Sequence, residues 1–596
     1  MNNNQSSLPK WDRLIAFIIL AVTPLIISLT TYDSFILPKI FWLSFWASLW
    51  MVVIVWQPIR WKLFASPLTK PLMALFAVSL LSVLLNYRSP IQLHGLMNLA
   101  VFIALYFAFQ RFWNMRPSPH HVAQALMAAV CLIAIYGLLQ DYGFDFANAT
   151  GGVRDWRSKV ISTLGNPNFL AGWIAICLPV AIGYGLRKKT RFFGFLYSGL
   201  TVMLIAACHT VTFSVGAATG LIAALITSIS GSVFLLHRIR IPIIRSVILA
   251  IIATSAFGWY MLENPYNSHG RSLYREAWES SHWWSGMGAR RFIWQTTRLM
   301  IEEKPVTGIG FSNYLTVHEH YQGMNYKRQW HAHDRDYVVP VDQPHFQLLE
   351  TAAEIGPLGV LALLWIAMAW LKAAGRTLRR SSDPWFAWGA YAGVWVAVMH
   401  SFSSFPFHLP ANALLVVVLG SYITSSPQPD SSEPIIAPLW SKIVCVALAL
   451  IICISSGMQY FGSQYMRWGY ESNGLSAIDY LSKSRSLNPH SHQTHFLLGL
   501  HYKNQGWYGN ALESFKHALR YQEDIQSHKQ MAEIYLLQNN IPSAIAEFER
   551  IIEINPVFPG HYRDLITALG DKASPERIKE LTALAKQLED QLETSG

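Results

Sequence analysis

Residues 439–461, which read LWSKIVCVALALIICISSGMQYF, are the last long apolar run of the chain. A helix rises about 1.5 Å per residue, so an apolar run of this length crosses the roughly 30 Å of hydrocarbon in a bilayer. More runs of this kind precede it, and a polar composition typical of soluble helices follows it. The sequence therefore predicts an all-α protein in which a polytopic membrane helix bundle is followed by a soluble helical region.

The composition of the whole chain also indicates a membrane protein. Of its 596 residues, 52% are hydrophobic and 14% are charged, whereas about 25% of a typical soluble chain is charged. The five cysteines all lie inside apolar runs, so we expect neither a disulfide framework nor a cysteine-based zinc site. About 12 to 13 membrane spans are expected. They cover residues 14–31, 35–56, 68–86, 93–112, 122–140, 169–186, 192–212, 215–236, 243–262, 346–371, 386–401, 408–424 and 439–461.

These runs divide the chain into an N-terminus, two groups of spans, a long loop and a soluble domain. We expect residues 1–13 to be cytoplasmic and residues 14–262 to hold spans one to nine. Residues 263–345 are then a large extracytoplasmic loop, and residues 346–461 hold spans ten to thirteen. Residues 462–596 form the soluble domain. Loops of this length inside a compact domain usually carry function.

The net charge of +11 arises largely from basic residues in alternate connections between the spans. By the positive-inside rule these connections and the N-terminus, with Lys10 and Arg13, are cytoplasmic. Positive charge here sets orientation, so nucleic acid is not an expected partner. The long connections 141–168 and 263–345 face the other side. The basic residues are Arg60, Lys62, Lys70, Arg111, Arg116, Arg187, Lys188, Lys189, Arg191, Arg238, Arg240, Arg245, Lys372, Arg376, Arg379 and Arg380.

The soluble domain contains a helical repeat. Leu498, Gly499 and Tyr502 recur as Met531, Ala532 and Tyr535, an offset of 33 residues. This spacing resembles the tetratricopeptide repeat, in which small residues let two helices pack closely and stacked units form an α-solenoid. Residues 574–592 read as its capping helix. Two interpretations stay open: the repeats only stabilise the last span, or they form a docking surface for a protein or glycan partner.

Three polar segments interrupt the apolar pattern on the expected outer side. The first is STLGNPNFLAG at residues 162–172, where Asn166 and Asn168 offer amide groups at the mouth of span six. The second runs from Arg290 through Trp294 to the pattern P-x-x-G-x-G-x-x-N-Y ending at Tyr314. The third is H-x-x-x-L-E-x-x-x-E-x-G-x-x-G at residues 345–359. Taken alone, the first could be a tight turn with a helix cap.

In this order, the three segments resemble the O-antigen ligase and polymerase family, over roughly residues 8–425. Members are bacterial membrane glycosyltransferases that use a polyprenyl-diphosphate-linked glycan. The resemblance implies transfer of a glycan from undecaprenyl diphosphate to an acceptor hydroxyl on a glycan, lipid or protein. It also implies a periplasmic site in the inner membrane, among membrane lipid, and no metal or nucleotide cofactor. Ligase, polymerase and protein O-oligosaccharyltransferase are not distinguished by these residues.

The expected chemistry assigns roles to two residues. A diphosphate leaving group needs a cation, and the planar fork of Arg290 binds phosphate oxygens in pairs. Arg291 is the neighbouring alternative, and only the spacing to Trp294 favours Arg290. His345 matches the family's histidine and is the candidate base for the acceptor hydroxyl. The competing interpretations are an interfacial arginine and a histidine that caps a helix.

Departures from the family pattern leave one phosphate contact open. The family often has arginine before its STLGNPN-like segment, where this chain has Lys159, and often has Ser-Arg-Gly where this chain has Val215 between Ser214 and Gly216. Lys159 or Arg157, or else Arg154, could supply the contact from the first outer loop. Glu350 and Glu354 are supporting candidates.

Four histidines of the long loop, His318, His320, His331 and His333, form pairs that could ligate a metal. A His-x-His pair in a polar loop is more often solvated, so we expect no metal site. Two other functions stay open: a transporter or flippase, and an inactive scaffold for envelope assembly with a partner-binding repeat domain. Transporters place ionisable groups at mid-membrane, whereas the candidates here lie in outer loops.

Overall fold

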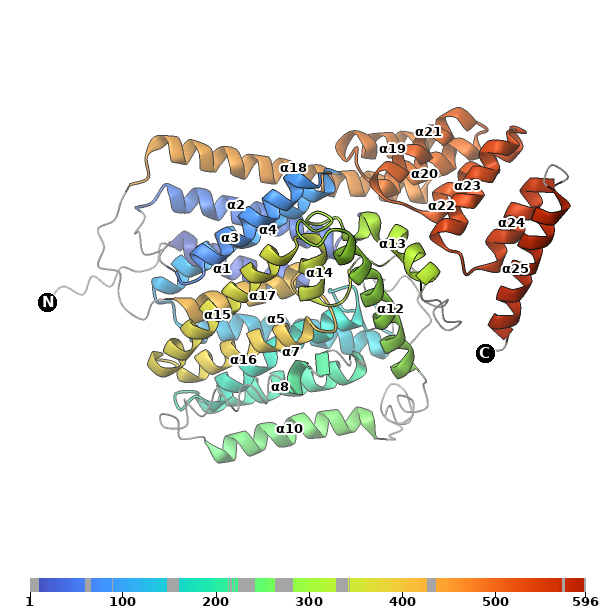
Figure 1. Cartoon of the computed structure of the whole chain (residues 1–596). Helices are drawn as coiled ribbons and strands as arrows, with labels where there is room; N and C mark the ends of the chain where they lie inside the picture. The colour runs from blue at the N-terminus through green and yellow to red at the C-terminus, as the bar shows by residue number, and fades with distance from the viewer. Residues whose placement is uncertain are drawn as a thin grey trace.

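A computed structural model of the chain describes residues 10–58, 66–87, 89–146, 160–212, 214, 217–218, 220–222, 242–262, 282–328, 341, 343–425, 436–570 and 574–593. Within these ranges all regular structure is helical, and no strand is present. Long helices run side by side in one bundle, and a curved array of shorter helices adjoins one end of it (Figure 1). The predicted all-α architecture is confirmed.

The bundle is built from helices in two parts of the chain. The first part contains α1 (Lys10–Val22), α2 (Ile36–Val55), α3 (Thr69–Leu85), α4 (Ile91–Asn114), α5 (Pro119–Asp141), α7 (Pro167–Leu186), α8 (Phe192–Thr212) and α10 (Ile243–Met261). The second contains α15 (Pro357–Arg380), α16 (Pro384–His400), α17 (Pro410–Thr424) and α18 (Leu439–Glu471). Between them lie α12 (His282–Glu303), α13 (Tyr314–Arg328) and α14 (Gln347–Glu354).

In the described part of the chain, 8 helices are long and apolar enough to cross a membrane: α2, α4, α5, α7, α8, α10, α15 and α18. The shorter helices α1, α3, α16 and α17 occupy further positions at which the sequence predicts spans. The expected span 215–236 lies almost wholly outside the described residues. The protein is thus a multi-pass membrane protein.

The span expected at 346–371 is corrected by the structure, because it consists of two helices. The short α14 ends before Gly356, which has φ 79°, and Pro357 begins α15. A positive φ is unfavourable for residues with a Cβ, and proline is preorganised for the first turn of a helix. The apolar run therefore continues through a break that hydropathy alone does not register.

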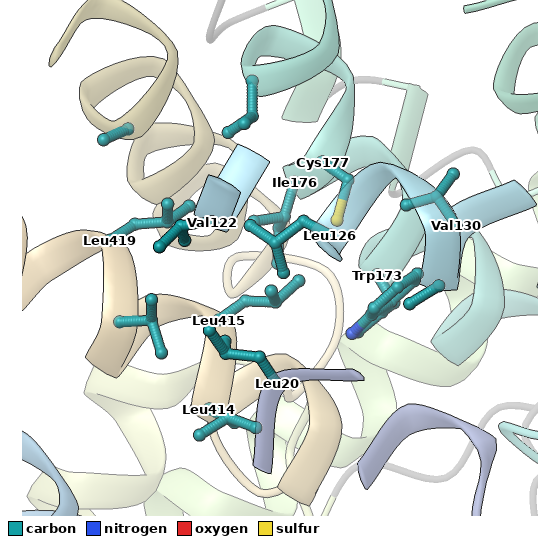
Figure 2. Close-up of a cluster of buried hydrophobic side chains, with 14 of the residues drawn as sticks. Leu20, Val122, Leu126, Val130, Trp173, Ile176, Cys177, Leu414, Leu415 and Leu419 are labelled. Atoms are coloured by element: carbon teal, nitrogen blue, oxygen red, sulfur yellow. The ribbon is translucent and has the colours of Figure 1, made fainter. Parts of the chain in front are cut away.

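The core of the bundle surrounds α7, which is apolar on all sides and largely buried. Figure 2 shows side chains of α1, α5, α7 and α17 interlocked around Trp173 and Leu415. Glycines bring α16 against α7, because a Cβ at Gly393 would lie 2.7 Å from the carbonyl oxygen of Ile176. Small residues at helix contacts are the usual means of close packing in membranes.

The soluble domain is joined to the bundle by α18. This helix packs along α2, where the Phe41 and Tyr460 rings stack at 4.9 Å, and its outer part leads into the repeats. The solenoid consists of α19 (Gly474–Leu487), α20 (His492–Asn504), α21 (Tyr508–Tyr521), α22 (Ile525–Leu537), α23 (Ile541–Ile554), α24 (Pro559–Leu569) and α25 (Pro575–Glu593). Helix α13 contacts α23, so the repeats and the long loop lie at the same end of the bundle (Figure 1).

Candidate active site

The second and third segments singled out in the sequence form one structural unit. The carboxylate of Glu354 accepts hydrogen bonds from the backbone N–H groups of Ser312 at 2.8 Å and Tyr314 at 3.0 Å. Its backbone carbonyl accepts from Gly310 N at 3.0 Å. Burial and the nearby Glu350 raise the pKa of Glu354. With its oxygens engaged in this way, Glu354 is a structural residue that joins α14 to the loop after α12.

Glycines at this junction allow two backbones to meet. Gly308 has φ 66°, and a Cβ there would overlap the backbone of Glu354. Gly310 has φ 108°, and a Cβ there would lie 2.5 Å from Nε2 of Gln92. The hydroxyl of Ser82 in α3 donates to the carbonyl of Glu354 at 2.8 Å. The spacing P-x-x-G-x-G-x-x-N-Y therefore encodes a tight connection that fixes α12 and α14 on the bundle.

Arg290 lies on the inner side of α12. Its side chain is half-buried, and Nη2 donates to the carbonyl oxygen of Ser403 at 3.1 Å. Burial lowers the pKa of this guanidinium, although arginine remains charged in proteins. Among the residues that the structure describes, no carboxylate forms an ion pair with it. Arg291 is exposed. The structure thus separates the two arginines and directs Arg290 inward.

Trp294 lies one turn after Arg290 and positions the segment around His345. Its indole Nε1 donates to the carbonyl oxygen of Pro344 at 2.9 Å. Its ring centroid is 6.0 Å from that of Phe346. Trp294, expected to bind substrate, is therefore engaged with residues on both sides of the histidine, which explains the spacing R-x-x-x-W in terms of structure.

His345 occupies a strained turn between the long loop and α14. Its φ is 54°, which is uncommon for a residue with a side chain. Its ring is half-buried and packs 5.2 Å from the ring of Phe405. Burial and the charge of Arg290 lower the pKa of His345 to about 4. The imidazole is therefore neutral at pH 7, the form in which it can accept a proton.

The alternative role of His345 as a helix cap does not fit the geometry. The N-cap residue of α14 is Phe346, and no side chain accepts a hydrogen bond there. Strained φ values that persist in a fold are frequent at functional sites. His345 is thus held beside Arg290 by Trp294 and Phe405 instead of by a capping interaction.

The connection between α16 and α17 completes the site, and the sequence analysis did not single it out. Besides Ser403, which pairs with Arg290, the carbonyl of Ser401 accepts from Gln347 N at 3.2 Å. Phe405 lies between the rings of His345 and Phe169, the latter at 5.3 Å. A signal was present in the polar stretch HSFSSFPFHLPAN at residues 400–412, which separates two apolar runs.

An ion pair between the buried Glu350 and the more exposed His408 fixes this connection on α14. Glu350 Oε2 lies 3.1 Å from Nε2 of His408 and also accepts from Gln347 at 3.3 Å. Burial of His408 opposes its charge, but Glu350 outweighs this and raises the pKa of His408. Glu350 therefore has a partner and acts as a support for the site.

The STLGNPN segment brings the start of α7 to the same place. Asn166 is the N-cap of α7, and its side chain accepts from Asn168 N at 2.8 Å, whereas the Asn168 side chain is exposed. The buried Lys39, which the sequence analysis missed, donates to the carbonyl of Thr163 at 2.7 Å. It also donates to two carbonyls near the start of α2 and so anchors the segment.

Several expected residues lie outside the described part of the chain. These are Arg154, Arg157, Lys159, Val215, His331 and His333. His318 is buried in α13, and its neighbour-but-one His320 is exposed. Within the described residues there is no group of three or more His, Cys, Asp or Glu side chains that could hold a metal ion. The prediction that the histidine pairs bind no metal stays a prediction.

Comparisons with known proteins identify two parts of the chain. A family model described as O-antigen ligase matches residues 168–364. A model described as tetratricopeptide repeat matches residues 492–525. A search of curated proteins finds no match. A solved structure, "Crystal structure of APC/C hetero-tetramer Cut9-Hcn1", aligns with 12% identity over 83% of this chain and 76% of that chain, with a TM-score of 0.19.

The O-antigen ligase match runs from α7 to the first turns of α15 and therefore includes Arg290, His345 and the Glu354 junction. The repeat match covers α20 and α21. Both resemblances stated from the sequence are confirmed. The chain is a multi-pass membrane protein with an O-antigen ligase family domain and a C-terminal tetratricopeptide repeat.

Proposed function

We propose that the protein is a membrane glycosyltransferase that moves a glycan from undecaprenyl diphosphate to an acceptor hydroxyl. The observation that carries this proposal is that Arg290, a half-buried cation, and the imidazole of His345 both lie against the connection between α16 and α17, through Ser403 and Phe405. Among the described residues this half-buried cation has no carboxylate partner, and a bound diphosphate would offset the cost of its burial. The O-antigen ligase domain supports the same class of reaction.

Arg290 and His345 act in the same reaction step. The acceptor oxygen forms a bond to the anomeric carbon as the bond from that carbon to the phosphate oxygen breaks. The electron pair of the broken bond stays on the diphosphate, where Arg290 stabilises the added charge. His345 takes the proton of the acceptor hydroxyl. Negative charge brought by the donor also favours the protonated imidazole, so donor binding strengthens the base.

The orientation follows from the basic ends of the helices. Arg187, at the end of α7, pairs with Asp383 before α16 at 2.6 Å. This end, which also holds Arg379 and Arg380 of α15, is opposite to the end that carries His345. By the positive-inside rule the basic end is cytoplasmic. The site and the repeats then face the periplasm of a bacterial inner membrane, and the repeats offer a surface for a protein partner.

The proposal is tested with the purified full chain, an undecaprenyl-diphosphate-linked oligosaccharide and candidate acceptors. We expect transfer that requires the lipid diphosphate and persists with chelator. If chelator abolishes transfer, the charge-stabilising role passes from Arg290 to a metal. In cells, loss of the protein should cause lipid-linked glycan to accumulate. Unchanged levels of lipid-linked glycan in such cells, together with no transfer in vitro, would overturn the proposal.

A further inference from the structure

A second polar cluster lies inside the bundle next to Arg290. His400 ends α16, has an exposed fraction of 1%, and both of its ring nitrogens lack a hydrogen-bond partner among the described residues. The ring fits against α7 only because residue 172 is glycine, since a Cβ there would lie 2.5 Å from Nδ1 of His400. The last glycine of STLGNPNFLAG thus makes room for this imidazole.

Asn412 faces the same place from α17. It has an exposed fraction of 1%, and its amide nitrogen also lacks a partner in the described part of the protein. Its Nδ2 would lie 3.3 Å from a Cβ at Gly172, the position that His400 also approaches. Leaving a buried polar group without a hydrogen bond is unfavourable, because its interaction with water is lost and not replaced. Two such groups against one glycine therefore point to a polar ligand that both can contact.

The electrostatic sign of this cluster favours an anion. Asn412 lies in the first turn of α17, whose N-terminus has no side-chain cap and so presents positive partial charge. The C-terminus of α16 is also near, but its last carbonyls accept bonds from Ser401, Phe402 and Ser403. The charges that act on His400 are those of Arg290 and His209, and no carboxylate of the described residues is among them.

The cluster is continuous with the transfer site. Ser403, whose carbonyl binds Arg290, donates its own N–H to the carbonyl of His400 at 3.0 Å. Next to the cluster in sequence, Trp173 on α7 and Leu414 on α17 belong to the apolar core that Figure 2 shows. The polar groups therefore form the inner end of the site, where His209 of α8 also lies close enough to act on His400.

We propose that His400 and Asn412 bind the diphosphate of the lipid-linked donor from the inner side, opposite Arg290. This inference rests on the proposed function and adds two substrate-binding residues to it. When the glycosidic bond breaks, the electron pair remains on the phosphate oxygen. Hydrogen bonds donated by a neutral His400 ring and by the Asn412 amide then strengthen with the charge. Neither residue changes covalently.

Binding of undecaprenyl diphosphate to the purified full chain in detergent tests this proposal. Asn412→Asp places a carboxylate where an anion would bind, and we expect the affinity to fall about 10-fold or more. His400→Gln and Asn412→Leu should each weaken binding as well, because they remove or displace a donor. The matched control is His318→Gln, since His318 is also buried with both ring nitrogens unpartnered but lies in α13, and its affinity should equal wild type.

The outcomes separate this inference from the proposed function. If Arg290→Ala loses the ligand while Asn412→Asp and His400→Gln bind as wild type, the inference is wrong and the proposed function stands. If the wild-type protein binds undecaprenyl diphosphate no better than undecaprenyl phosphate, both fail. Displacement of the probe by phosphatidylglycerol would also overturn the inference, because the cluster would then bind any lipid phosphate. Only variants that elute as wild type in gel filtration are compared. If variants fold at only one of the two positions, His400 or Asn412, the result at that position decides.

Discussion

The guanidinium of Arg290 donates to the carbonyl oxygen of Ser403 at 3.1 Å, which joins a helix of the long loop to the connection between two membrane helices. One carbonyl uses one of the five N–H donors of arginine. The remaining donors are held at a fixed angle beside His345. The hydrogen bond thus orients the guanidinium while leaving most of it available for a ligand.

Replacement of Arg290 by lysine should remove most transfer although it keeps the charge. An ammonium is a point charge and cannot bind two phosphate oxygens in a plane while it holds Ser403. The loss of one charged hydrogen bond, about 1.5 to 3 kcal/mol, corresponds to roughly 10-fold to 150-fold in kcat/KM. The measurement is transfer per folded molecule.

Arg291→Lys is the matched control, because its side chain is exposed on the same helix. It should transfer at the wild-type rate. Normal transfer by a well-folded Arg290→Ala protein would remove Arg290 from the mechanism.

Activity should persist in mild acid if His345 is the base. Burial and Arg290 lower its pKa to about 4, so the imidazole stays neutral as pH falls through the usual value of 6.5. In the free enzyme kcat/KM should therefore stay level down to about pH 5 and fall as the pH approaches 4. His345→Ala should lose about 10² to 10⁴ in rate. A decline centred near pH 6.5, or near-normal specific activity of His345→Ala, would contradict the assignment.

The junction at Gly308 should be sensitive to a single methyl group. Gly308→Ala requires alanine at φ 66°, which costs about 1 to 2 kcal/mol, and its Cβ would also overlap the backbone of Glu354. We expect a lower thermal midpoint and a loss of transfer. Gly375→Ala in α15 is the control, since a Cβ there meets nothing within 4 Å. Equal midpoints for the two variants would show that the junction is not tight.

The helices and polar segments that form this site could be predicted from the sequence better than the contacts that link them. Hydropathy located the spans, and the three polar segments contain Arg290 and His345, which the structure places side by side. Lys39 was missed because it sits among apolar residues, and the 401–409 connection was missed because its partners are rings and backbone groups far away in sequence. Periodicity reports which face of a helix is apolar. It does not report which distant carbonyl a lysine will reach.

The repeats and the transfer site should lie on one side of the membrane. Helix α13 contacts α23, and α18 passes along α2 before it reaches the solenoid. Reporter fusions at Ser425 and at Ser595 should therefore report opposite sides, with Ser595 on the side of the long loop. If both fusions report the same side of the membrane, the repeats do not lie on the side of the transfer site. A fusion within residues 187–191 should report the same side as Ser425.

The contact between the repeats and the long loop should weaken as pH rises. Glu319 in α13 has an exposed fraction of 5%, and it faces Asp524, Glu523, His528 and the N–H of Ile525. Burial and these two carboxylates raise the pKa of Glu319 to about 8. A carboxyl with a raised pKa favours the docked state while protonated, so its contribution is lost as pH rises from about 4.5 to 8.

His528 stabilises the repeat domain itself in the same pH direction, because both of its carboxylate partners lie within the repeats. Its burial opposes charge, but the carboxylates of Glu523 at 3.1 Å and Glu547 at 2.6 Å outweigh this and raise the pKa of His528 to about 9. Its stabilising charge is complete below pH 6.5 and is lost as pH approaches 9. The apolar contact of Phe292 and Tyr326 with Val557 does not titrate and holds the domains together at every pH.

Glu319→Gln isolates the carboxyl, because glutamine resembles the protonated acid. At pH 8 the variant should dock more firmly than wild type, by about 1 to 3 kcal/mol, and the two should converge near pH 5. Hydrogen exchange of the α13 amides against pH measures this, with slower exchange in the variant at pH 8. Glu549→Gln, an exposed change on α23, is the control and should follow wild type at every pH. Exchange rates of Glu319→Gln and wild type that change alike with pH would show that this carboxyl does not control docking.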